Sequence, residues 1–110
     1  VDGPTVLSAS RFMSIMSLDL NAFAQLAHVH RNTVSRAPAS HGVQTFLRTS
    51  VRVLRAAYDV SGHDLSRAIF WYQHEPLAPF GYKTAETLVS EGRANDVIGY
   101  VESLRAGFVG

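Results

Sequence analysis

Apolar residues recur at three- and four-residue steps along most of this chain. The series is longest over residues 43–60, where Val43, Val51, Leu54 and Tyr58 fall on a helical repeat with either Phe46 or Leu47. No segment alternates strictly between apolar and polar residues, and the hairpin dipeptide Asn-Gly does not occur. The pattern therefore predicts an all-α fold.

Breaks in the repeat divide the chain into seven predicted helices, at about 8–16, 20–27, 31–36, 43–60, 64–73, a short stretch after Thr84, and 93–106. Asp19 and Thr84 are placed to cap two of them. Gly62 and Gly107 are expected to end two others. Gly99 lies inside the last helix, where glycine costs about 1 kcal/mol relative to alanine, and therefore suggests close packing.

The same spacing predicts the buried face of each helix. Beyond the long series, the expected core residues are Phe12, Ile15 and Met16 in the first helix, Leu65, Ala68 and Ile69 with Trp71 or Tyr72 in the fifth, and Val97, Val101 and Leu104 in the last.

Composition narrows the class of protein. The chain has 110 residues, 46% of them hydrophobic and 17% charged, which suits one domain or two very small modules that share a core. It has no cysteine, so disulfides, thiolate catalysis and thiolate zinc sites are excluded. No apolar run approaches the roughly 20 residues of a membrane span, and the first residues do not resemble a signal peptide. We therefore expect a cytoplasmic protein with no membrane contact.

Residues 20–37 have the spacing of a helix-turn-helix. Ala24 provides the small side chain where the two helices would cross, and apolar residues at Phe23, Ala27, Val29, Val34 and Ala37 would hold them together. His28 stands where such turns usually have glycine. The predicted DNA-reading face carries hydrogen-bonding side chains, namely His30, Arg31, Asn32, Thr33, Ser35 and Arg36. The alternative is a helical hairpin with a solvated outer face. Net charge is only +1, so one chain would make few phosphate contacts.

Other polar groups give weaker indications. Arg48, Arg52 and Arg55 share one face of the long helix and would contact either phosphates or solvent, with Arg55 pairing to Asp59 in the second case. The five histidines lack the spacing and the carboxylates of a metal site. The chain has no nucleophile elbow, phosphate-binding glycine loop or close carboxylate pair, so no catalytic residues, metal or cofactor are expected.

Residues 64–110 contain a further series of motifs. A helix begins at Asp64 and bears Ala68 and Trp71, and Pro76 follows in a loop. The stretch at 81–88 is Gly-Tyr-Lys-Thr-Ala-Glu-Thr-Leu. These motifs resemble the toxin-binding domain of the Xre/MbcA/ParS antitoxins, whose pattern here is Gly-x-x-(Thr)-Pro-x-x-Leu, with Ala85 in place of the usual proline. Upstream, Ser-Val-Arg-Val-Leu-Arg at 50–55 is similar to the family's Ser-x-Arg-x-x-Arg, and the helix-turn-helix lies where the family has its Xre-like module.

This resemblance implies three parts: an Xre-like module at 1–42, a connecting helix at 43–63 and a toxin-binding domain at 64–110. It implies an antitoxin of a type II toxin–antitoxin pair, which binds a RES-domain toxin, blocks its NAD-degrading active site and represses its own operon. Such proteins form homodimers or hetero-oligomers with the toxin. The matching contact residues are Lys83, Thr84, Glu86, Arg105, Gly107, Phe108, Val109 and Gly110. A DNA-binding repressor and a ParS-like accessory protein with another partner are the alternatives.

Overall fold

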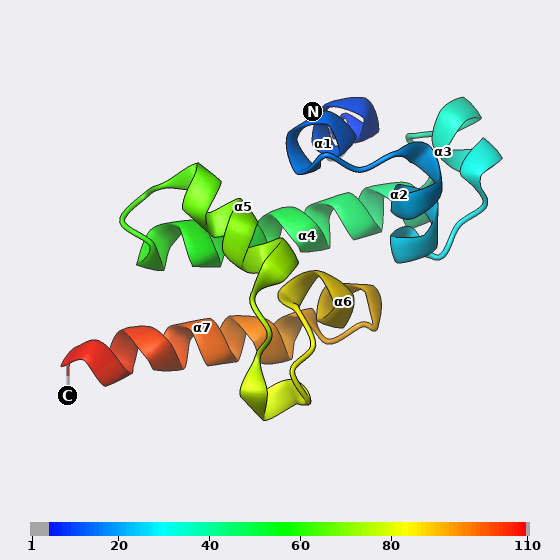
Figure 1. Cartoon of the computed structure of the whole chain (residues 1–110). Coiled ribbons are helices and arrows are strands. Elements are labelled where there is room, and N and C mark those ends of the chain that lie inside the picture. The colour runs from blue at the N-terminus through cyan, green and yellow to red at the C-terminus, as the bar shows by residue number, and fades with distance from the viewer. Residues whose placement is uncertain (1–4, 110) are drawn as a thin grey trace. The chain divides into compact units, whose positions relative to one another are not determined.

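The computed structural model describes residues 5–109, and the side chains of residues 5–105. This part is helical and contains no strand, in agreement with the predicted all-α class (Figure 1). A single antiparallel bridge joins Leu77 to Lys83. The elements are α1 (Ala9–Met16), α2 (Leu20–Ala27), α3 (Arg31–Arg36), α4 (His41–Val60), α5 (Leu65–His74), the 3-10 turn η1 (Ala78–Phe80), α6 (Ala85–Ser90) and α7 (Ala94–Val109).

The chain divides into two compact units, residues 1–48 and residues 49–110. The division falls inside α4 and not in a loop. Unit 1 contains α1, α2, α3 and the first part of α4. Unit 2 contains the rest of α4 together with α5, η1, α6 and α7.

Three phenylalanine rings form the centre of unit 1. Phe12 of α1, Phe23 of α2 and Phe46 of α4 meet edge to face, with ring centroids 5.3 to 6.2 Å apart. Edge-to-face pairs add about 0.5–1.5 kcal/mol beyond the apolar area that they bury. Three helices are thus held together by one aromatic cluster.

A buried glutamine joins two loops of unit 1 to α4. Gln44 is only 3% exposed. Its Oε1 accepts a hydrogen bond from the Leu7 N–H at 2.8 Å, and its Nε2 donates to the Leu7 carbonyl at 2.9 Å and to the Pro38 carbonyl at 2.8 Å. The side chain therefore fixes the segment before α1 and the loop after α3.

We expect Gln44→Leu to destabilise the protein by about 2–4 kcal/mol, because the substitution leaves backbone groups of Leu7 and Pro38 without their partner. Urea unfolding of the full chain measures the change. Thr45→Ala is the control, since this neighbouring side chain is exposed and should stay within about 0.5 kcal/mol of the parent. Equal stabilities for the two variants would contradict the assigned role of Gln44.

The predicted caps are confirmed. Asp19 Oδ1 accepts from the Ala22 N–H at 2.7 Å, and Thr84 Oγ1 accepts from the Thr87 N–H at 3.2 Å. Gly62 has the left-handed φ of +78° that was expected after the long helix. The predicted stop at Gly107 is wrong, because α7 continues through Val109. Glycine permits a left-handed cap but does not impose one.

Several predicted core positions are wrong. Ile15 is 57% exposed, Leu65 52%, Val51 45% and Leu104 37%. In α4 the face buried within unit 2 carries Ser50, Val53 and Ala57 instead of the bulkier residues one position later. Small side chains suit this face because the buried Tyr72 phenol of α5 lies against Ser50. The positions of the helices were predicted correctly. Which face of α4 is buried, however, depends on the contact with Tyr72.

The expected close packing at Gly99 is also absent. A Cβ atom added at Gly99 would meet nothing within 4 Å among the described residues. The glycine therefore weakens α7 without gaining a close contact in return.

Gly99→Ala should accordingly raise the free energy of unfolding by about 0.5–1 kcal/mol, through helix propensity alone. Thermal or urea unfolding tests this. Gly92→Ala is the matched control: its surroundings are equally open, but its φ of +82° strains any side chain, so that variant should lose stability. A loss of stability in Gly99→Ala would show that position 99 has a packing role.

Candidate binding surfaces

The turn between α2 and α3 closes through a histidine in the left-handed conformation. His28 has φ 58° and ψ 41°, and its N–H bonds back to the Gln25 carbonyl at 3.3 Å. The next N–H, that of Val29, bonds to the Ala24 carbonyl at 3.1 Å. These two bonds form the double closure that usually places glycine at such a position. The turn thus has the geometry expected with glycine, although the residue is histidine.

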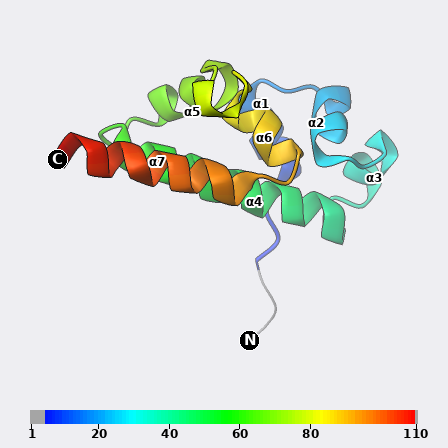
Figure 2. The ribbon, with the colours of Figure 1, turned by 90° about the horizontal axis from the view of Figure 1, so that it is seen from below.

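The residues predicted to support this pair of helices are partly confirmed. Phe23, Ala24 and Val34 are buried, and Val29 is half-buried. Ala37 was expected to be apolar support but is exposed. It is the C-cap of α3, where the backbone has left the helix at φ −134°. Figures 1 and 2 both show α2 and α3 next to each other within unit 1.

All six predicted DNA-reading residues lie on or directly before α3. His30 Nδ1 accepts from the Asn32 N–H at 3.0 Å and so caps the helix. Arg31 Nη1 donates to Asn21 Oδ1 of α2 over a long 3.5 Å. Thr33 is half-buried, whereas the other five residues are exposed. The sequence of unit 1 carries four arginines against two aspartates, so this surface has a modest positive charge.

The predicted toxin contacts at 83–86 have partners within unit 2. Lys83 Nζ bonds both Glu91 carboxylate oxygens, at 2.9 and 3.0 Å. Thr84 caps α6, and Glu86 Oε2 accepts from Gln73 Nε2 at 3.0 Å. Lys83 and Glu86 therefore have roles inside the fold.

The other predicted contacts lie at the far end of α7. Arg105 is exposed, and the backbone of 107–109 continues the helix. The side chains of Phe108 and Val109, and all of Gly110, lie outside the described residues. Since α7 has 16 residues, its two ends are roughly 24 Å apart at 1.5 Å per residue. The fold consequently separates the residues at 83–86 from Arg105 and the residues that follow it.

An apolar groove that the sequence did not predict lies near the last turns of α4 and α7. It encloses about 240 Å³ between these helices and α5. Its lining includes Val60, Leu104 and the single tryptophan, Trp71. Arg67 is the charged residue of the lining. Leu104 was predicted as core, and Trp71 was predicted as core in alternative to Tyr72, which is the buried residue of the two. Leu104 and Trp71 both follow the apolar repeat, but they lie on the rim of the core because no other helix in the described part of unit 2 covers them.

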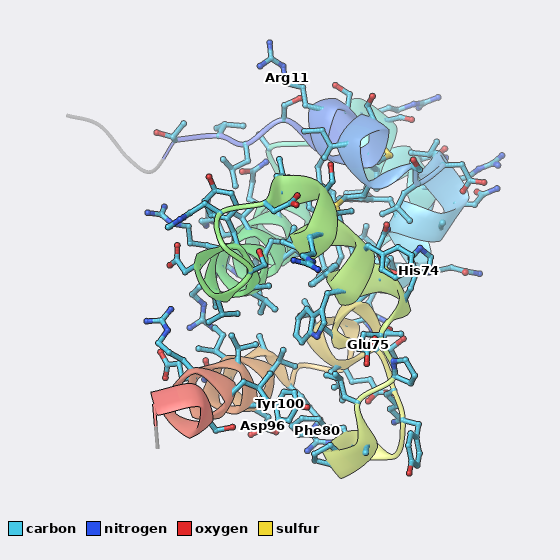
Figure 3. The ribbon with its side chains drawn as sticks, turned by 60° about the vertical axis from the view of Figure 1, so that its left-hand side comes forward. Arg11, His74, Glu75, Phe80, Asp96 and Tyr100 are labelled. Carbon is cyan, nitrogen blue, oxygen red and sulfur yellow. The ribbon has the colours of Figure 1, made fainter. Side chains whose placement is uncertain are left out.

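A second cluster joins η1 to α7. The Phe80 ring meets the Tyr100 ring edge to face at 5.8 Å, and the Arg93 guanidinium lies 5.2 Å from the Phe80 centroid. Arg93 also pairs with Asp96 at 3.0 Å. Figure 3 shows Phe80, Asp96 and Tyr100 close to one another. These contacts explain how the irregular segment after α5 is held against α7.

The arginines of α4 have different surroundings. Arg52 donates to Asn95 Oδ1 of α7 at 2.8 Å, which links two helices of unit 2. The pairing of Arg55 with Asp59 is not formed in the described part of the chain. Asp59 lies instead 3.8 Å from His63, one turn further on.

Two hydroxyl groups are buried in the core of unit 2. Burial raises the pKa of the Tyr72 phenol well above its ordinary value, so this group stays neutral. Among the described residues neither Tyr72 OH nor Ser50 Oγ has a hydrogen-bond partner of good geometry. A neutral phenol enclosed in the core serves packing.

Within residues 5–109 no three histidine or acidic side chains gather closely enough to hold a metal ion. Over the same range, no helix combines the length and the apolar character needed to cross a membrane. No family model, curated protein or solved structure matches this chain.

Proposed function

We propose that the protein is an antitoxin whose unit 2 binds a RES-domain toxin and keeps NAD from its active site. The observation that carries the proposal is the open apolar groove beside the end of α7. Exposed apolar surface that is concave and rimmed by a cation is typical of a protein-binding site. The sequence resemblance of residues 64–110 to antitoxin domains supports a toxin as the occupant.

Two parts of this surface, the groove and the end of α7, would have different roles. The groove would supply affinity, because Trp71 and Leu104 offer apolar area that is not covered within unit 2. Residues 108–110 would block the toxin's cleft. The backbone of Phe108 and Val109 belongs to α7, and backbone that is already helical loses little conformational entropy on binding.

Two variants separate these roles in a purified toxin–antitoxin pair. Leu104→Asp should weaken the complex at least about tenfold, since it places a charge in the apolar groove. Deleting 108–110 should leave the complex intact but restore NAD degradation. Affinity is measured by calorimetry and activity by NAD loss.

Ile15→Asp is the matched control, because Ile15 is also an exposed aliphatic residue but belongs to unit 1, so this variant should change neither readout. Full binding and inhibition by Leu104→Asp would remove the groove from the proposal. Undiminished inhibition by the chain that lacks 108–110 would show that these residues do not block the toxin's cleft. A folded parent that has no effect on any NAD-degrading toxin would favour a ParS-like role.

DNA binding by unit 1 is the second candidate. It is supported by the closed turn at His28 and by the exposed polar side chains on α3, both of which a DNA-reading helix-turn-helix would need. In a dimer, two copies of α3 would need to lie about 34 Å apart to read successive turns of the major groove. Arg31 and Arg36 would supply the main charged contacts.

Replacing Arg31 and Arg36 together by alanine should weaken binding to the DNA upstream of the gene. It should also reduce the slope of the logarithm of the binding constant against the logarithm of the salt concentration by about 2, if each arginine contacts one phosphate. Fluorescence anisotropy at several salt concentrations measures both quantities. The double variant Arg11→Ala with Arg48→Ala removes the same charge from unit 1 outside α3 and should keep most of the binding. Equal losses in the two double variants, or a parent that does not bind at low salt, would reject the role.

A further inference from the structure

The helix α3 begins with an unusual cap. Side chains cap five helices in the described part of the chain, and four of these caps are serine, threonine or aspartate: Ser8, Asp19, Asp64 and Thr84. The fifth is His30, whose ring nitrogen Nδ1 accepts from the Asn32 N–H at 3.0 Å. An imidazole that accepts through Nδ1 carries its proton on Nε2 and is neutral.

Protonation abolishes this cap. In the imidazolium both ring nitrogens are donors, so an N–H would face the N–H of Asn32 where an acceptor stood before. The added positive charge would also lie at the N-terminal end of the helix, where the backbone dipoles already present partial positive charge. The ring is exposed, so water and protons reach it directly.

The rest of α3 gives little compensation. The helix has six residues and buries one of them, Val34. Helices of this length are marginal without tertiary support, and an N-cap is therefore a large part of what holds the first turn.

The charged groups of unit 1 offer the imidazolium little support. On its own helix the neighbours are Arg31 and Arg36, and the turn before it carries His28. In the surrounding helices the described titratable side chains are Arg11, Asp19, His41 and Arg48. Asp19 is the one carboxylate among them, and its Oδ1 already accepts from the Ala22 N–H.

We propose that His30 makes the start of α3 a pH-dependent element, ordered while the ring is neutral and frayed once it is protonated. The folded helix uses the neutral ring. The stability conferred by the cap is therefore present while the ring is neutral and is lost when the ring takes up a proton, because the imidazolium has no acceptor for the Asn32 N–H. This property belongs to the fold of unit 1 and holds whether or not α3 contacts DNA or unit 2 contacts a toxin.

Nuclear magnetic resonance of the full chain between pH 7.5 and pH 5.5 tests the proposal. The 13Cα shifts of Arg31–Arg36 report the helical population of α3, and the ratio of ordered to frayed helix should fall about three- to tenfold over this range. Shifts of α2 should stay constant, because the cap of α2 is the carboxylate of Asp19 and not an imidazole.

Two variants decide the cause. His30→Asn replaces the ring by a good cap that does not titrate, so α3 should keep its helical shifts at both pH values. His41→Asn removes a histidine from the start of α4 in the same unit and should leave the pH response of α3 unchanged. The proposal is overturned if α3 of the parent is constant over this range, or if His30→Asn responds to pH as the parent does.

Discussion

The three hydrogen bonds of the buried Gln44 amide determine how the chain of unit 1 is arranged. They hold Leu7, in the segment before α1, and Pro38, in the loop after α3, against the same turn of α4. The aromatic contact of Phe12, Phe23 and Phe46 then brings α1, α2 and α4 together. With these elements fixed, α3 needs only Val34 and its caps to stay on α2, which explains why a six-residue helix can persist there.

Much of the fold could be predicted from the sequence, because helix ends have local chemical signatures. Asp19 and Thr84 were identified as caps from their positions alone. The face that each helix buries was less predictable. Val51 and Ser50 are adjacent, and only the Tyr72 ring, which comes from another helix, decides that the serine lies inside. Gln44 gave no signal, since a polar residue is ordinarily expected at the surface and its partners are backbone groups far away in the sequence.

The candidate sites show the same limit. The polar residues of α3 were found because they are consecutive, and the fold keeps them together. The residues at 83–86 and those at the end of α7 were all predicted as toxin contacts, and the length of α7 places the two groups apart, which spacing in the sequence does not reveal. The groove was missed because its lining comes from three helices, and each of its apolar side chains fits a core repeat equally well. These side chains line a groove and not a core because no other helix in the described part of unit 2 covers them.

The functional account has a physical logic that links the two units to different partners. Unit 1 presents hydrogen-bond donors and excess positive charge, which suit phosphates and base edges. Unit 2 presents an apolar concavity next to a long helix, which suits a protein. The most direct test is to co-express the chain with the product of the neighbouring gene and to measure both co-purification and cellular NAD. The account predicts a stable complex and NAD kept at its normal level, with NAD lost when the chain is omitted. A well-folded chain that neither binds that product nor protects NAD would contradict it.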